Sequence, residues 1–106
     1  MHPALRMRQY QQQAVTSSSP DQLVVKLYDL GIAACHRQDR NKLRLVLREL
    51  IAALNFDQGG EIAQGLYDLY EYCLRESVNG DLEIVTELLG ELRDVWKNHI
   101  VGRKAA

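Results

Sequence analysis

The residues of this chain that could carry chemistry are few and scattered. The three histidines, His2, His36 and His99, fall in different segments, and no pair of histidines or cysteines has the spacing of a metal site. No nucleophile stands beside a base, and no carboxylates are forced to share a site, as a catalytic centre would require. The sequence therefore predicts a protein that is not an enzyme and that holds neither a metal nor a cofactor.

The two cysteines and the glycine pair have simpler interpretations than reactive sites. Cys35 and Cys73 are too few and too far apart for a disulfide scaffold or a zinc module. Each is expected on the apolar face of a helix, where a free thiol packs as a small hydrophobe. Gly59 and Gly60 lack the preceding strand and the following lysine of a phosphate-binding loop.

Length and composition indicate one soluble domain. The chain has 106 residues, of which 46% are hydrophobic and 25% charged, with a net charge of -1. Such a balanced surface argues against nucleic acid or an anionic membrane as the main partner. No apolar run is long enough to span a bilayer, and the first residues lack the apolar stretch of a secretory signal. The expected location is the cytosol.

Start and stop signals divide the chain into four helices after a polar N-terminal arm. Ser19, Asp39 and Asp81 are each expected to cap a helix, and the segment from Asn55 to Gly60 is expected to break the chain. The predicted helices cover residues 19–36, 39–54, 61–78 and 81–100.

Short connections between amphipathic helices imply antiparallel neighbours. The predicted fold class is therefore all-α, an antiparallel four-helix bundle with a short N-terminal arm. The arm is expected over residues 1–18, the bundle over 19–101 and a C-terminal tail over 102–106.

The apolar faces of these helices are wider than a surface helix commonly needs. At about 100° per residue, the helix over 61–78 carries a stripe of Ile62, Leu66, Leu69 and Cys73. Flanking residues widen this stripe to roughly 160°, against the ~100° that such a helix commonly buries. Wide faces around one small core should leave apolar grooves on the outside, and such grooves usually mark binding sites.

Three blocks of sequence, taken in order, cover nearly the whole chain. The first is Tyr10-Gln11-Gln12-Gln13-Ala14-Val15-Thr16 with Ser19-Pro20, Leu23-Val24 and Leu27-Tyr28-Asp29. The second is Gln58-Gly59-Gly60-Glu61-Ile62-Ala63 with Leu66, Leu69-Tyr70 and Tyr72. The third is Leu92-Arg93-Asp94 with Trp96. Together these blocks resemble the flagellar secretion chaperones of the FliS family.

The resemblance implies an antiparallel helical bundle without a cofactor, whose client is the C-terminal segment of flagellin. That segment is disordered when alone, and family chaperones let it wrap around the bundle, partly as helices in surface grooves. Covering it prevents premature polymerisation and keeps flagellin competent for export. Whether the protein also contacts a second partner, such as the flagellar export gate, is not decided by the sequence.

Two features depart from the family pattern. Leu30 stands directly after Leu27-Tyr28-Asp29, where family members commonly have glycine, and Gly31 follows it. The hairpin between Leu27 and Asp57 is also short by about ten residues, which removes ~7 Å from each of two helices at 1.5 Å per residue. The bundle is therefore expected to be short at the end with Arg37 to Arg40.

The residues expected to contact the client lie on the margins of the apolar stripes and in the arm. For Tyr70, a place in the core with only Tyr67 exposed is an equally supported alternative. For Trp96, core packing is favoured, with Leu88 and Val95 as the exposed contacts beside it. The predicted client-binding residues are Tyr10, Val25, Tyr28, Ile32, Ala63, Tyr67, Tyr70, Leu74, Leu88, Val95 and Trp96.

Two further alternatives remain open from the sequence. Tyr10 and the arm are expected either to form a displaceable cover over the client groove or to be a disordered tail. The protein as a whole is expected to be a chaperone that is monomeric or weakly dimeric. The alternative is a non-enzymatic helical adaptor whose spare apolar face makes a homodimer.

Overall fold

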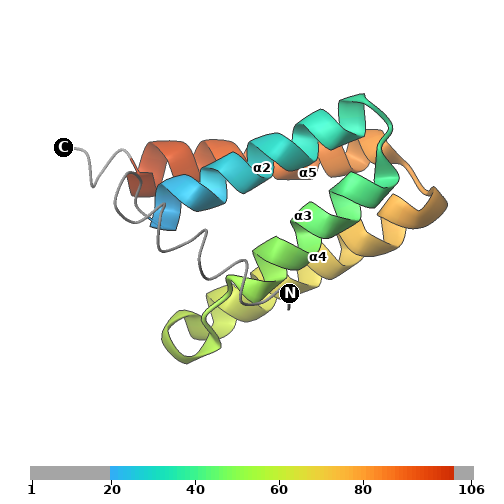
Figure 1. Cartoon of the computed structure of the whole chain (residues 1–106). Helices are drawn as coiled ribbons and strands as arrows, with labels where there is room; N and C mark the ends of the chain where they lie inside the picture. The colour runs from blue at the N-terminus through green and yellow to red at the C-terminus, as the bar shows by residue number, and fades with distance from the viewer. Residues whose placement is uncertain (1–19, 102–106) are drawn as a thin grey trace, which may run out of the picture.

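The computed structural model describes residues 20–101 and shows four α-helices in an up-down arrangement (Figure 1). They are α2 (Pro20–His36), α3 (Arg40–Ala52), α4 (Phe56–Asn79) and α5 (Leu82–Val95), and the turn η1 (Trp96–Val101) continues α5 as a π-helix. The described residues contain no strand. The predicted all-α four-helix bundle is confirmed, while the predicted arm and tail lie outside the described residues.

Side-chain caps start the helices where the sequence predicts them. The Asp39 carboxylate accepts a hydrogen bond from the backbone N–H of Lys42 at 3.0 Å and so begins α3. The Asp81 carboxylate accepts one from the N–H of Glu83 at 2.9 Å and begins α5. Both predicted caps are confirmed, whereas the predicted cap Ser19 lies outside the described residues.

The start of α4 differs from the prediction. The segment from Asn55 to Gly60 does not simply interrupt the chain, because the Asn55 side chain caps a helical turn that begins at Phe56. The break is confined to Gly60, whose φ of 51° and ψ of -121° are open mainly to glycine. The first turn of α4 is therefore joined to the rest of the helix through a glycine kink.

The helices form two layers that diverge toward one end of the molecule. In Figure 1 the pair α2 and α5 lies above the pair α3 and α4; the layers meet near the turns that follow α2 and α4 and separate toward the opposite end. Within the described chain α2 packs most closely on α5 and α3, α4 and α5 touch more sparsely, and the diagonal pair α2 and α4 has no close backbone contact. The start of α2, the start of α4 and the end of α5 therefore lie around the open end.

The core fills the space where the layers meet. Gly31 lies where a Cβ atom would come within 2.9 Å of Leu89 Cδ1 and 3.4 Å of Val46 Cγ1, so this mid-helix glycine lets three helices approach closely. Cys35 and Cys73 are both free and buried, which confirms the prediction of core packing. The largest fully buried side chains are Tyr28, Leu43, Leu47, Leu50, Tyr70, Cys73, Ser77, Val85 and Leu89.

The Arg40 guanidinium fastens the start of α3 to the end of α4. It donates to the backbone carbonyls of Glu76 and Ser77 at 3.3 Å each and to that of Gly80 at 3.1 Å. Carbonyls at a helix end lack intrahelical partners, and a cation beside them also complements the helix dipole.

Replacing Arg40 by methionine should therefore lower the free energy of unfolding by about 1–3 kcal/mol, because hydrogen bonds from a charged donor are lost. Lys42→Met, an exposed change on the same helix, is the matched control and should stay within ~0.5 kcal/mol. Urea unfolding followed by circular dichroism measures both. An equal loss in the two variants would contradict the role given to Arg40.

Burial raises the pKa of the Cys73 thiol to about 11, with the neighbouring Cys35 and Glu76 acting in the same direction. The thiol of the unfolded chain titrates near ~8.5, so the unfolded state loses its proton first as pH rises. The free energy of unfolding should then be flat below pH ~8 and fall above it, by at most ~1.4 kcal/mol per pH unit from this group. In Cys73→Ala the fall above pH ~8 should be shallower but should not vanish, because burial also raises the pKa of the remaining Cys35 thiol, and buried tyrosines add to the fall only above pH ~10. Urea unfolding across this range tests both curves, and identical curves would contradict the assignment.

Candidate functional site

An apolar cleft of about 290 Å³ opens where the two helix layers diverge. Residues of α2, α3, α4 and η1 contribute to its wall, and apart from Asn55 and Gln58 the lining side chains are almost entirely apolar. The lining residues are Val24, Leu50, Ala53, Leu54, Asn55, Gln58, Gly59, Ile62, Ala63, Leu66, Tyr70 and Trp96.

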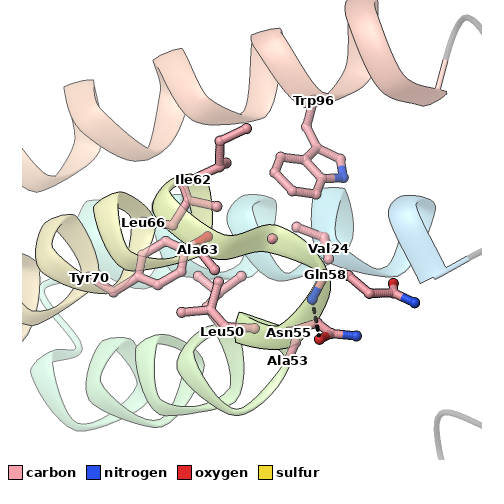
Figure 2. A pocket seen from close by; sticks show the side chains of 12 residues that line it. Val24, Leu50, Ala53, Asn55, Gln58, Ile62, Ala63, Leu66, Tyr70 and Trp96 are labelled. Atoms are coloured by element: carbon pink, nitrogen blue, oxygen red, sulfur yellow. Dashed lines mark hydrogen bonds between the residues drawn. The ribbon is translucent and has the colours of Figure 1, made fainter.

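The cleft is bounded by α4 on one side and by the end of α5 on the other (Figure 2). Trp96 extends from the end of α5 toward α4, while Ile62 and Leu66 project from α4 toward the α5 side. Val24 contributes from α2 and Leu50 from α3. Ile62 and Leu66 are four residues apart, so they share one face of α4 and present a continuous apolar edge.

The overhang of α4 beyond α3 explains why this edge has no partner. Arg40 at the start of α3 contacts the end of α4, and α3 has only 13 residues against 24 in α4. The surplus of 24 − 13 = 11 residues therefore lies mainly in the first turns of α4. Ile62 in these turns is 75% exposed, the largest value among the bulky apolar side chains of residues 21–98.

Three aromatic rings form a chain at the cleft: Tyr70 and Trp96 line it, and Tyr28 contacts both of them from the core. The ring of Tyr28 lies 6.3 Å from that of Trp96, edge to face, and 6.4 Å from that of Tyr70. The Tyr28 and Tyr70 hydroxyls form a hydrogen bond of 2.5 Å in the interior. Burial raises the pKa of both tyrosines, so both stay protonated and each hydroxyl satisfies the other.

The Trp96 indole keeps one unused donor. Its Nε1 atom is shielded from solvent and has no hydrogen-bond partner among the described residues. A buried donor left unsatisfied costs ~1–3 kcal/mol, so a bound segment that brings a carbonyl to this N–H would recover part of that energy. The cleft itself presents almost entirely apolar side chains to a ligand.

The structure divides the predicted client-binding residues into two groups. Ala63, Tyr70 and Trp96 line the cleft, and Tyr28 lies beneath them through its ring contacts. Val25, Ile32, Tyr67, Leu74 and Leu88 are half-buried and Val95 is 52% exposed; none of these six lines the cleft. Tyr10 lies outside the described residues.

The expected exposure of Tyr28 on a helix flank is wrong, because its side chain is 0% exposed. Tyr70 is also buried, at 2% exposure, while Tyr67 is half-buried, so the core alternative for Tyr70 is confirmed. The reason is the hydroxyl pair: each tyrosine can enter the interior since the other supplies its hydrogen-bond partner.

The buried face of α4 also differs from the apolar stripe that the sequence predicts for this helix. Ile62 and Leu69 were expected to face the core, yet they are exposed, while Ala63, Tyr70, Cys73 and Ser77 form the buried face. Sequence reasoning therefore missed Ile62 and Leu66 as cleft residues, together with Val24 and Leu50. The glycine pair directly before Ile62 was the available signal, because a chain break there frees the first turns of α4 from the bundle.

Other kinds of site find little support in the described part of the chain. No group of three or more His, Cys, Asp or Glu side chains among the described residues could hold a metal ion. No helix within residues 20–101 is long and apolar enough to cross a membrane.

The bundle and its cleft define a small all-helical protein with an open, apolar cleft at one end. Residues 36–103 match the sequence profile of a family described as flagellar protein FliS, a range that contains every cleft residue except Val24. The chain therefore belongs to the FliS family. It is similar to the flagellar secretion chaperone FliS of Salmonella typhimurium, with 29% identity over 106 aligned positions that cover 79% of this chain and 78% of the relative. No solved structure matches the chain.

The tyrosine pair beneath the cleft predicts a non-additive mutant cycle. Tyr70→Phe or Tyr28→Phe alone leaves one buried hydroxyl unpaired and should lower the free energy of unfolding by about 1–3 kcal/mol. The double variant removes both hydroxyls and should lose clearly less than the sum of the two single losses. Tyr67→Phe, which removes a hydroxyl outside the pair, should stay within ~0.5 kcal/mol. Urea unfolding of the variants measures the coupling free energy between the two substitutions. Strictly additive losses would contradict the proposed hydroxyl pair.

Proposed function

We propose that this FliS-family protein is a cytosolic chaperone that holds the C-terminal segment of flagellin, with the cleft as the anchoring site. The bound segment would be kept from premature polymerisation and remain competent for secretion, and no catalytic step is involved. The observation that carries the proposal is the apolar edge of exposed Ile62 and half-buried Leu66, which faces Trp96 across an open cleft.

The energetics of the cleft favour an apolar, helical segment as the ligand. Burying a side chain such as Ile62 fully would gain about 1.5–3 kcal/mol, and Leu66 and Trp96 add further apolar area. Ordering a disordered segment costs 2–5 kcal/mol or more, so several such anchors must be covered at once. A helix laid along the edge of α4 would cover them with residues spaced three and four apart.

The predicted contacts outside the cleft fit a segment that is longer than the cleft. Val95 is exposed directly before Trp96, and Leu88 lies about two turns earlier on the same helix. With Val25, Ile32, Tyr67 and Leu74 they are proposed as the remainder of the client path around the bundle. Tyr10 and the arm are proposed to cover the cleft when no client is bound.

The protein's single tryptophan provides a direct test, because Trp96 lines the cleft. Titration with a flagellin C-terminal peptide should shift its fluorescence to shorter wavelength and give a one-to-one complex. Ile62→Gln should weaken binding about tenfold or more, since a polar side chain replaces the most exposed apolar one of the cleft. Val78→Gln is the matched control: Val78 lies on the same helix at 61% exposure but at its far end, and peptide affinity should be unchanged.

Gel filtration with and without the peptide separates this function from the homodimer alternative. A monomer that becomes a one-to-one complex supports the chaperone. A stable dimer that is indifferent to the peptide, and that Ile62→Gln dissociates, would show instead that the cleft edge joins two copies. A flagellar export gate component, the second proposed partner, should bind the client-loaded protein without displacing the peptide.

A further inference from the structure

A second, chemically different surface lies on the outer face of α3. Leu45 is 57% exposed there, with Lys42 on one side and Arg44 and Arg48 on the other at helical spacing. Arg37 adds an exposed cation in the turn before the helix. This basic face (Arg37, Lys42, Arg44, Leu45 and Arg48) belongs to a helix whose opposite side packs in the core.

No salt bridge within residues 20–101 involves a cation of the basic face. The salt bridges of the described part of the chain join Arg75 to Glu71 on α4, and Arg93 to Asp29 on α2 and to Asp94 on α5; none of them reaches α3. Arg44 donates to the neutral Asn41 side chain instead. Arg44 and Arg48 are four residues apart, so their like charges repel one another on the helix surface.

The segment that carries the basic face differs in net charge from the segment that follows it. Residues 37–52 carry five basic and two acidic side chains, a net charge of +3, whereas residues 53–95 carry two basic and ten acidic ones, a net charge of -8. Arg40 is turned toward α4 and held by its carbonyls, so the other four cations remain on the face. The positive charge is confined to one face, and the protein as a whole has a net charge of -1. A partner with a small negatively charged surface is therefore attracted to this face, whereas a large negatively charged surface would also meet the acidic parts of the protein.

We propose that the basic face of α3 is a docking surface for an acidic, amphipathic helical segment of a second protein. Acidic side chains of the segment would pair with Lys42, Arg44 and Arg48, and one of its apolar side chains would cover Leu45. Nucleic acid fits less well because its phosphate backbone offers nothing apolar to Leu45 and would meet the acidic remainder of the protein. A lipid surface would require far more apolar area than one leucine.

The proposal does not rest on the function of the cleft, which lies on the inner side of α3. On α3 the cleft residue Leu50 is buried on the side opposite the exposed Leu45, and the cleft residues Ala53 and Leu54 follow the end of the helix. Both surfaces can therefore be occupied at the same time.

The test uses the full chain and a short synthetic peptide of Glu, Ala and Leu, with leucines three and four residues apart. Amide shifts in two-dimensional NMR should change over α3 and leave residues 58–66 of the cleft unchanged. Arg48→Glu should weaken binding about tenfold. Arg75→Glu, the same charge reversal at an exposed site of α4, should change it less than about twofold. Leu45→Gln should weaken it several-fold, and Val78→Gln should not.

Three control ligands give the result that would overturn the proposal. A peptide of the same composition with scattered leucines, a polyglutamate of equal length and a short DNA duplex should all bind more weakly than the patterned peptide. The proposal fails if any of them binds as tightly as the patterned peptide, because the face would then recognise charge alone. It also fails if Arg48→Glu and Arg75→Glu weaken the patterned peptide equally, or if anionic phosphatidylglycerol vesicles compete it away.

Discussion

The hydrogen bond between the buried hydroxyls of Tyr28 and Tyr70 is the interaction on which the geometry of the cleft depends. It joins α2 and α4, which lie diagonally across the bundle and have no close backbone contact within residues 20–101. Each hydroxyl would be an unsatisfied buried group without the other, so the two helices are favoured at one separation. The Trp96 ring packs on Tyr28, and the end of α5 is thereby tied to the same pair.

The opening of the bundle follows from helix lengths and one glycine. Because α3 is much shorter than α4 and is clamped to its far end by Arg40, the first turns of α4 extend past the core. Gly60 then turns the chain back through a kink that other residues rarely adopt, which leaves Ile62 at the exposed edge. A cleft that is apolar yet open is thus a consequence of backbone geometry.

The parts of the fold that follow local rules were predictable. Asp39 and Asp81 cap their helices as expected, because capping requires only neighbouring backbone N–H groups. The burial of Tyr28 and the exposure of Ile62 were not predicted, because helical periodicity places residues on a face without saying which neighbour covers it. Ala63, Tyr70 and Trp96 were named as binding residues and do line the cleft, but their companions Val24, Leu50 and Leu66 looked like ordinary core positions.

The amino-acid sequence by itself determined the helical class, the starts of α3 and α5 and the FliS-family membership, since caps, periodicity and motifs act over a few residues of the chain. It also determined the charge contrast between residues 37–52 and 53–95. Only the tertiary structure decided which apolar residues stay exposed, because that depends on how far one helix extends beyond another. The pairing of Tyr28 with Tyr70 was likewise decided only by the tertiary structure, since it joins helices that are remote in sequence and diagonal in space.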